Sequence, residues 1–346
     1  HAKPSVSIDI GGGTSDVMIF SEGQPQLITS FKFAGNSIFG DGFNSNIKTN
    51  GFVQKFHQQF MEQLNQNNLI AEVAILKKIY NENASSIDLV NFLFSLKNNK
   101  SLVDKKIELD FAKMLKNDSD FKIIFLLFYS SIVYHIAQMM KMKGMEAPRN
   151  ILFSGTGSKT LNILDSDKNL GALTKLFEAI FNEVYGSNDS KIKLKANSNP
   201  KQITCKGGFY IDEDLNVNSY KELVEFNVGN SNDQSVQKRT QLDDLSISYN
   251  NVDRNFRNGV IENIEEFYKL FIKLNKSLNF KDEFGISTAS LKVFDNHKST
   301  DLEDYIMAGL DEAKKDSDEN EALSETLFFY PLIGKLNELA TEINEY

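Results

Sequence analysis

The sequence has little cysteine and histidine and no tryptophan. Its one cysteine, Cys205, cannot form an intrachain disulfide. The four histidines are His1, His57, His135 and His297, and their spacing matches no zinc-ligand motif. A disulfide scaffold and a Cys/His metal cage are therefore excluded. We expect Cys205 and His135 to be buried packing residues.

Basic charge is also scarce. The sequence has 38 Lys and Arg against 47 Asp and Glu, which gives a formal net charge of -9. Its basic residues form isolated pairs, such as Lys77-Lys78, and no larger cluster. Because a nucleic-acid partner needs a basic patch, we expect no nucleic acid to bind.

Long apolar runs and a targeting signal are missing as well. A helix is predicted from about Asp120 to Lys143, but Ser130 and Ser131 interrupt its apolar stretch. That stretch is shorter than the roughly 20 residues that span a bilayer, so we predict a buried core helix and no membrane partner. The first residues form no signal peptide, which favours a cytoplasmic protein. The start at His1, without a Met, indicates a fragment.

The composition is that of a globular chain, with 41% hydrophobic and 25% charged residues. Strand, glycine loop and helix alternate up to about residue 211, which predicts an α/β fold. From about Asp212 the chain becomes rich in Asn, Asp and Ser, and its longer segments are helical. We therefore predict an α/β domain over 1–211, with a helical insertion over about 69–117, and a mainly helical extension of unknown role over 212–346.

Periodicity predicts the individual elements. Extended segments are expected around Ser7–Asp9, Val17–Phe20, Leu27–Phe33, Asn150–Ser154 and Ile192–Ala196, with a turn over Ser21–Gln26. Besides the insertion and the long helix, helices are expected at Phe52–Leu64, Leu161–Leu164, Leu173–Val184, Asn199–Gly208, Asn255–Leu278, Thr300–Lys315 and Glu321–Tyr346. The acidic stretch within Asp301–Asn320 is interpreted as a solvated face or a docking site.

The most informative stretch is a glycine turn between two extended segments near the N-terminus. Gly11, Gly12 and Gly13 permit positive φ and a close approach of other backbone. A turn of this kind presents backbone N–H groups with no Cβ in the way, which suits an anion such as phosphate. Thr14 adds a hydroxyl donor.

Two carboxylates flank this turn. Asp9 and Asp16 could hold a hydrated Mg²⁺, because carboxylate oxygens are the ligands that this ion prefers. The glycine turn alone could also be a tight hairpin without any ligand. With the carboxylates and Thr14 beside it, the working hypothesis is a site for phosphate and a metal ion.

A second glycine loop consists of Gly155, Thr156, Gly157 and Ser158. It ends in Lys-Thr like a Walker A loop, but that motif needs glycines where this chain has Phe153 and Ser158. The first turn is not a dinucleotide fingerprint either, because the third glycine of that motif falls on Asp16. A P-loop and a Rossmann site are therefore rejected. A plain turn between strand and helix stays open for the second loop.

The stretch Asp9–Val17 resembles the second phosphate motif of the actin-like ATPase superfamily, which includes actin, heat-shock chaperone ATPase domains, bacterial cell-division actins and sugar kinases. Three later segments are similar to further motifs of that superfamily, in the same order. They are Gly35–Asn44, Ile151–Ser158 with the long helix before it, and Asn199–Gly208. The resemblance covers about residues 5–211 and implies an actin-like, ribonuclease-H-like lobe.

The resemblance also implies a ligand and a set of roles. ATP would be held through its phosphates by Gly11, Gly12, Gly13 and Thr14, and its adenosine would be bordered by Gly155, Thr156, Gly157 and Ser158. Mg would be oriented through water by Asp9, and Asp16 would support the loop. The chain departs from the superfamily pattern at Asn36, Thr156 and Lys159, which stand where Asp, Gly and Arg are usual.

No second Asp-x-Gly glycine loop exists in the sequence. The resemblance therefore implies that this chain is the C-terminal lobe alone and that it pairs with an N-terminal lobe of the same protein. No catalytic residue is assigned. We expect ATP hydrolysis by the intact protein and negligible hydrolysis by this chain. Two alternatives stay open, a scaffold or interaction module without nucleotide and a sugar or acid kinase, in which Asp9–Thr14 would be the first phosphate motif. A protein partner or a filament is compatible with each.

Overall fold

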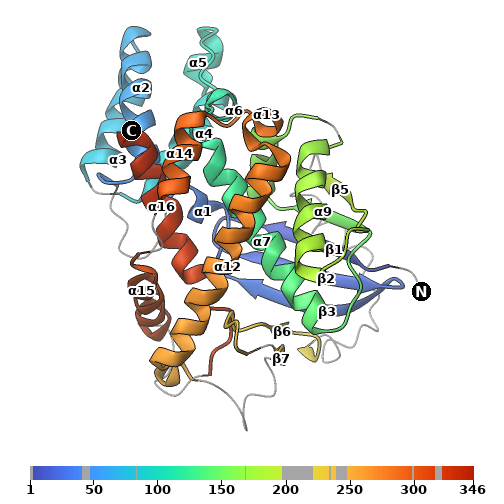
Figure 1. Ribbon diagram of the computed structural model, residues 1–346. Helices are drawn as coiled ribbons and strands as arrows, with labels where there is room; N and C mark the ends of the chain where they lie inside the picture. Colours follow the sequence, from blue (N-terminus) through green and yellow to red (C-terminus); the bar gives the residue numbers. More distant parts are fainter. Residues whose placement is uncertain are drawn as a thin grey trace, which may run out of the picture.

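The structure is a computed structural model with an α/β architecture, in which a five-stranded mixed sheet is covered by helices (Figure 1). It describes residues 3–40, 47–82, 84–167, 169–196, 221–233, 235–238, 248–297, 300–315 and 322–346. The predicted helix over Asn199–Gly208, which contains Cys205, lies outside the described residues, as does the end of the Gly35–Asn44 motif.

The main sheet is built around its central strand, β1, in the order β3-β2-β1-β4-β5. β1, β2 and β3 form an antiparallel meander, whereas β4 runs parallel to β1 and β5 runs parallel to β4. The strands are β1 Ser5–Ile10, β2 Ser15–Ser21, β3 Gln24–Phe31, β4 Asn150–Ser154 and β5 Lys193–Ala196. Because parallel neighbours end at the same edge of a sheet, the segments after β1 and β4 begin side by side.

The predicted strands are confirmed, but the turn between β2 and β3 is shorter than expected. Only Glu22 and Gly23 form it, with φ values of 53° and 79°. Two successive residues with positive φ make a tight hairpin turn that matches the twist of the flanking strands. β3 therefore begins at Gln24, inside the predicted turn.

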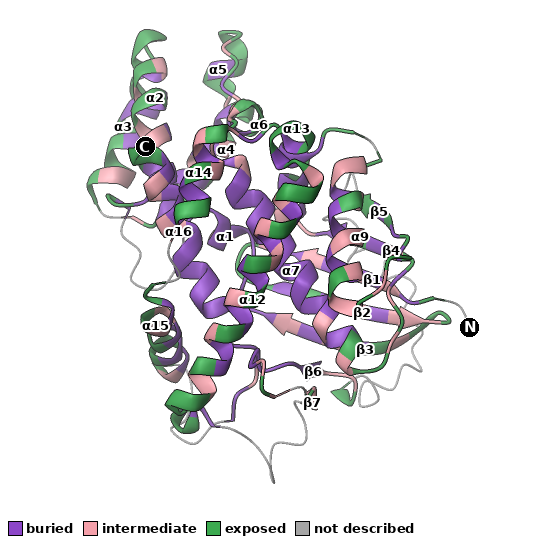
Figure 2. Cartoon of the chain, in the orientation of Figure 1, coloured by how far each residue is buried: buried purple, intermediate pink, exposed green. Residues whose placement is uncertain are grey.

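Alternation along the strands decides which face of the sheet is covered. Val6, Ile8 and Ile10 of β1 are buried, and the residues between them are half-buried. This is the period of two that a strand imposes when one of its faces packs on a core. Figure 2 shows buried residues where helices lie beside the sheet, while the outer helices also carry exposed turns.

The central helix of the core is α7, Lys122–Met142. By length and composition α7 could cross a membrane, yet 94% of its apolar window is buried inside the protein. Tyr129 of α7 contacts Phe153 of β4, and His135 contacts Phe31 of β3, with ring centroids 5.7 and 6.0 Å apart. The prediction of a buried core helix that contains a buried His135 is confirmed.

The described chain between β3 and α7 is mainly helical, which confirms the predicted helix over Phe52–Leu64 and the helical insertion, whereas the short helix at Gly35–Ile38 was not predicted. Its elements are α1 Gly35–Ile38, α2 Gly51–Gln66, α3 Ile70–Asn81, α4 Ser86–Ser95, η1 Leu96–Asn98, α5 Lys100–Asp104 and α6 Phe111–Asn117. Side chains cap several of these helices. The Asn50 side chain accepts a hydrogen bond from Val53 N at the start of α2, and Ser85 with Asp88 forms a capping box before α4.

The remaining helices follow β4. They are η2 Gly157–Thr160, α8 Leu161–Leu164, α9 Gly171–Tyr185, η3 Tyr249–Asn251, α12 Arg254–Leu278, α13 Phe280–Phe284, α14 Thr288–Asn296, α15 Leu302–Lys315 and α16 Phe329–Glu345. A second sheet pairs β6 Glu225–Phe226 with β7 Gln237–Lys238. The predictions of α8, α9, α12 and α15 are confirmed, whereas α13 and α14 were not predicted.

The last helix starts later than the predicted Glu321. α16 begins at Phe329, so that Pro331 lies in its first turn. Proline lacks an N–H and is tolerated there, whereas in a helix interior it would clash with the preceding turn. Just before the helix, Leu327 donates its N–H to Val228 O at 3.0 Å, so this segment is tied to a different part of the chain.

Residues on both sides of the predicted boundary at 211/212 share one hydrophobic core. Phe329 of α16 stacks against Phe31 and Phe33, with ring centroids 4.4 and 4.6 Å apart. Beside β3, Ile28 donates its N–H to Leu223 O at 2.8 Å. The boundary itself stays a prediction.

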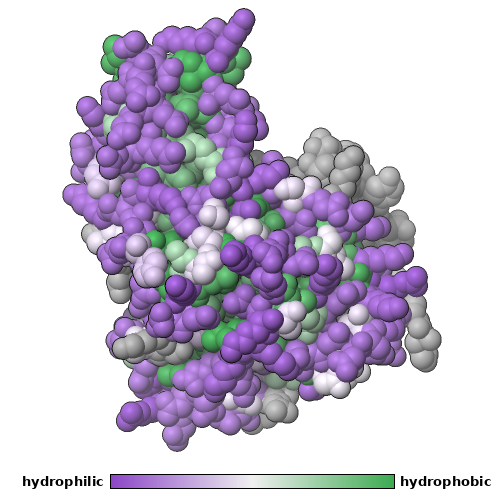
Figure 3. All heavy atoms as spheres, turned by 45° about the horizontal axis from the view of Figure 1, so that its top comes forward, coloured by the Kyte–Doolittle hydropathy of each residue, from purple (hydrophilic) through white to green (hydrophobic). Residues whose placement is uncertain are grey.

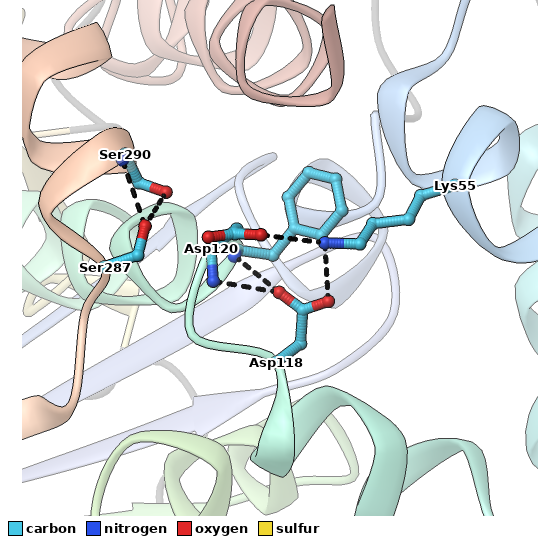
Figure 4. A network of polar contacts seen from close by, with 6 residues as sticks. Lys55, Asp118, Asp120, Ser287 and Ser290 are labelled. Carbon is cyan, nitrogen blue, oxygen red and sulfur yellow. Dashed lines mark hydrogen bonds and ion pairs between the residues drawn. The ribbon is translucent and has the colours of Figure 1, made fainter. Parts of the chain in front are cut away.

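A polar network ties three helical segments together (Figure 4). The ammonium of Lys55 on α2 lies 2.7 Å from Asp118 and 3.2 Å from Asp120, just before α7. Ser287 caps α14 nearby by accepting a hydrogen bond from Ser290 N. Burial alone would raise the pKa of Asp120, but the hydroxyl of Ser287 and the ammonium of Lys55 outweigh it, so this pKa lies below its usual value.

Several exposed apolar side chains lie on the helical insertion, and others in the described chain lie elsewhere, at Leu152, Met307 and Tyr346. Ile70 and Ile75 on α3 are 80% and 47% exposed, and Val103 on α5 is 58% exposed. Figure 3 shows hydrophobic atoms among hydrophilic ones at the end of the molecule where α2 and α5 project. These side chains are available to a protein partner, which stays a prediction.

Candidate functional site

The two glycine loops lie against each other at one edge of the main sheet. The first glycine loop, Gly11–Thr14, joins β1 to β2, and the second glycine loop, Gly155–Ser158, follows β4. A Cβ added to Gly157 would lie 2.8 Å from Gly11 O, closer than real Cβ atoms approach. The fold therefore brings together loops that are more than 140 residues apart in sequence, because β1 and β4 are adjacent parallel strands.

A third segment packs against the first glycine loop. Gly35 and Asn36, at the start of α1, donate their N–H groups to Gly11 O and Gly12 O at 3.1 and 2.8 Å. A Cβ added to Gly12 would lie 3.2 Å from the Asn36 side-chain oxygen. The start of the Gly35–Asn44 motif thus belongs to the same site as the two glycine loops.

The reason for glycine differs between the two loops. None of the glycines in the first loop has a positive φ, so this freedom of glycine is not used there. The predicted close approach does occur, because Thr14 O lies beside Gly11 and the Asn36 side chain lies beside Gly12, whereas the space around Gly13 is open. In the second loop Gly155 does have a φ of +80°, where a side chain would also overlap Ile10 O.

The first glycine loop exposes backbone donors. Gly11 uses its N–H within the turn, donating to Thr14 O at 2.9 Å. Gly12, Gly13 and Thr14 are exposed, and their N–H groups donate to none of the residues that the structure describes. Three unpaired N–H groups in succession suit an anion such as a phosphate.

The two predicted metal carboxylates lie opposite each other. Asp9 on β1 and Asp16 on β2 are register partners in the antiparallel pair, so their side chains project on the same face. Within the described chain, no Lys, Arg or His nitrogen lies within 4.0 Å of either carboxylate. Like charges directly opposite destabilise a strand pair, and a cation between or near them would remove that cost. The residues present therefore fit a magnesium ion beside a phosphate.

Asp9 is also linked to the second glycine loop. The hydroxyl of Ser154, at the end of β4, donates to Asp9 Oδ2 at 2.9 Å. The pairing of β1 with β4 brings these side chains together, since Asp9 and Ser154 are register partners. Asp9 is half-buried, whereas Asp16 is exposed.

Side-chain hydroxyl groups donate hydrogen bonds to backbone carbonyls of the second glycine loop. Ser158 donates to Gly155 O at 2.7 Å, and Tyr129 of α7 donates to Gly157 O at 3.2 Å. Tyr129 also lies 2.7 Å from the Thr160 hydroxyl. Burial raises the pKa of Tyr129 because it disfavours the phenolate, so the phenol keeps its proton and acts as a donor. The loop is thus attached to the core helix.

The structure places the predicted site residues at one edge of the sheet, where the exposed ones are Gly12, Gly13, Thr14, Asp16 and Thr156. Sequence reasoning assigned no role to Ser154 or Tyr129. The Ser154 hydroxyl stands at the end of a predicted strand, but its contact with Asp9 depends on the pairing of β1 with β4, which the sequence did not predict. Nothing in the sequence pattern identified Tyr129, because its contact depends on how α7 packs against the sheet.

One further group of possible metal ligands lies outside this site. Ligand atoms of His297, Glu338 and Glu342 lie within 4.8 Å of one another. Two ion pairs account for the arrangement, because His297 Nδ1 lies 2.8 Å from Glu342 and Lys335 Nζ lies 2.6 Å from Glu338. The contact of His297 with Glu342 attaches α16 to the end of α14, whereas Lys335 and Glu338 both lie on α16, and each carboxylate has a partner without an ion.

A groove of about 690 Å³ between α7, α9 and α12 is also separate from the glycine loops. Several of its charged side chains are paired within the protein. Lys273 lies 2.7 Å from Glu183, and Lys141 donates to Val184 O at 2.7 Å. None of the predicted site residues lines this groove, so we do not assign the site to it.

Comparison of the sequence with protein-family models and with curated proteins gives no match. The description of the α/β fold, the mixed five-stranded sheet and the meeting of the glycine loops therefore rests on this structure and not on a relative.

Proposed function

We propose that this chain is the C-terminal nucleotide-binding lobe of an actin-like ATPase. One observation supports this most. At the carboxyl ends of two adjacent parallel strands, a loop with three unpaired N–H groups lies against a second glycine loop, with the carboxylate of Asp9 between them. Ligands of open α/β sheets commonly bind outside the carboxyl ends of the strands.

The sheet also supports the proposed family. Its order β3-β2-β1-β4-β5, with an antiparallel meander followed by two parallel strands reached through helices, is the arrangement expected of a ribonuclease-H-like lobe. A fold does not define a function, so the proposal depends on the site more than on the sheet.

The proposed roles follow from the contacts. The N–H groups of Gly12, Gly13 and Thr14 bind phosphate oxygens, and Asp9 orients the hydrated magnesium that accompanies them. The second glycine loop borders the adenosine. Bound magnesium neutralises phosphate charge, and in-line attack on the γ-phosphate needs positioned groups on both sides of it. The resemblance assigns the opposing groups to an N-terminal lobe, so ATP turnover by this chain alone is expected to be negligible.

Calorimetry with Mg-ATP tests the proposal. Weak binding by the unaltered chain should vanish in the double variant Asp9→Ala with Gly13→Val. The space around Gly13 is open, so the valine covers the donors without a clash in the folded protein. Asp295→Ala, which removes an exposed carboxylate on α14, serves as the control and should bind like the unaltered chain. Unchanged binding in the double variant would contradict the proposal.

A second candidate is an interaction module that keeps this fold without a nucleotide. The hydrogen bonds of Gly35 and Asn36 to the first glycine loop favour it, because this packing gives Gly11 and Gly12 a purely structural reason to be glycine. This alternative predicts no ATP binding even when the N-terminal lobe is supplied. A kinase of the same superfamily would instead transfer phosphate to a small acceptor without that lobe.

A further inference from the structure

We infer that Ser154 is a positioning residue for magnesium in this site, acting through Asp9. The inference rests on the proposed function, and it concerns a residue to which the resemblance assigns no role. If so, the effect of magnesium on ATP binding depends on the contact between β1 and β4 as well as on the first glycine loop.

The contacts of Asp9 differ between its two oxygens. Oδ2 accepts the hydrogen bond from the Ser154 hydroxyl at 2.9 Å. Oδ1 receives no hydrogen bond from the described residues and lies against Gly155, where an added Cβ would overlap it. One oxygen is therefore held, and the other stays available at the start of the second glycine loop.

The position of Ser154 makes this hydrogen bond well defined. Ser154 is 5% exposed, and it is the register partner of Asp9 in the parallel pair of β1 and β4. Because this hydroxyl is buried on a strand, water competes little for its hydrogen bond and the side chain moves little. Hydrogen bonds from such outer groups orient the carboxylates that contact a metal ion or its water shell, and their loss typically weakens metal binding by about 10- to 100-fold.

The charge arrangement gives the bond a further role. Asp16 lies opposite Asp9 on the other neighbouring strand, and repulsion between the carboxylates favours a rotation of Asp9 away from Asp16. The hydroxyl of Ser154 lies on the β4 side of Asp9 and holds the carboxylate beside Gly155 of the second glycine loop, which lies against the first. The phosphate donors of Gly12, Gly13 and Thr14 belong to one of these loops.

The test compares ATP binding with magnesium and with EDTA for the unaltered chain, Ser154→Ala and Ser154→Thr. Alanine should reduce the strengthening of ATP binding by magnesium about 3- to 10-fold, less than for a metal ligand held directly because Asp9 acts through water. Threonine keeps the hydroxyl and should restore most of the effect. Binding in EDTA should be the same for all three chains, which a general distortion of the loop would not produce.

Ser158→Ala is the matched control. It removes the Ser158 hydroxyl of the second glycine loop, which donates to Gly155 O and does not contact Asp9. This variant should therefore change ATP binding with and without magnesium by the same factor. An equal magnesium effect in Ser154→Ala and the unaltered chain would overturn the inference alone. Failure of the unaltered chain to bind ATP under both conditions would overturn the proposed function and the inference with it.

Discussion

The glycine-loop edge of the sheet and the aromatic core around α7 are limited by opposite requirements. At the edge, backbone from three segments meets so closely that added atoms at Gly155 or Gly157 would overlap it. In the core, large rings fill the space, and Phe329 packs against both Phe31 and Phe33. The packing at the edge therefore requires glycines, which have no Cβ, whereas the packing of the core requires large side chains that fill it.

The polar groups of the two regions differ in the same way. At the edge, the unpaired N–H groups and carboxylates reach solvent, so leaving them without a protein partner costs little. In the core, both ring nitrogens of His135 are buried without a hydrogen-bond partner among the described residues. At the edge the unpaired groups are compatible with the proposed ligand site, whereas in the core they cost stability.

Loss of an aromatic side chain in the core should have the largest effect. Phe329→Ala removes a ring that is 1% exposed and that joins α16 to the sheet, and we expect it to lower the free energy of unfolding by about 3–5 kcal/mol. Urea unfolding measures this change. Ile70→Ala, at an apolar residue that is 80% exposed, should change it by less than about 0.5 kcal/mol. A small effect at Phe329 would mean that α16 is not part of the same core.

Addition of a single methyl group at the edge should have the next largest effect. Gly155→Ala meets Ile10 O and Asp9 Oδ1 at a φ of +80°, and we expect a loss of about 3 kcal/mol. Gly13→Ala, with open space and no positive φ, should leave the free energy of unfolding unchanged or raise it by less than about 1 kcal/mol. Equal effects of the two variants in urea unfolding would contradict the described loop geometry.

The buried histidine should make stability depend on pH. Burial lowers the pKa of His135 from 6.5 to about 3, so the unfolded chain takes up the proton first as the pH falls. The free energy of unfolding is therefore unaffected by this group above pH 6.5, and it falls by about 1.4 kcal/mol per pH unit from pH 6.5 toward pH 3.

His135→Leu should remove this part of the pH dependence, and at pH 7 it should leave stability unchanged or raise it, because no polar atom is then buried unpaired. The pKa of His57 is also lowered by burial, so the comparison uses the difference between the two chains. Parallel stability curves between pH 4 and pH 7 would show that His135 is not buried as described.

The smallest predicted effect concerns the network of Figure 4. Lys55→Met keeps most of the side chain but removes the charge between Asp118 and Asp120, and we expect a loss of about 1 kcal/mol that shrinks in high salt. Lys78→Met is the control, because its contact with Glu82 is long and exposed. Thermal unfolding at two salt concentrations compares them, and an identical response would mean that the network is no more than a surface ion pair.

Local patterns were enough to predict most elements. The alternation of Val6, Ile8 and Ile10 and the apolar faces of α2 and α12 are short-range properties, and each predicted its element. The strands, the helical insertion and the buried long helix were therefore predictable. The short helices α13 and α14 were missed, although Ser287 is a helix N-cap whose residue type is a usable start signal.

The candidate site was predictable in its parts and not in its assembly. Glycine runs next to Asp9 and after Phe153 pointed to two loops, and the resemblance suggested that they share a ligand. Of the two reasons predicted for glycine at Gly11–Gly13, close approach of other atoms is found at Gly11 and Gly12, whereas positive φ occurs only at Gly155 of the second loop. Close packing between distant segments is a tertiary property, which no local pattern reports.

The sequence by itself determined the α/β class, the positions of the glycine loops and the carboxylates beside them, since these depend on residue type and on periods of a few residues. Only the tertiary structure decided that β1 pairs with β4. That pairing places the two loops together, brings the Ser154 hydroxyl to Asp9, and puts Tyr129 under the second loop. The physical reason is that strand order follows from packing of the whole core, so contacts across about 145 residues depend on everything between them.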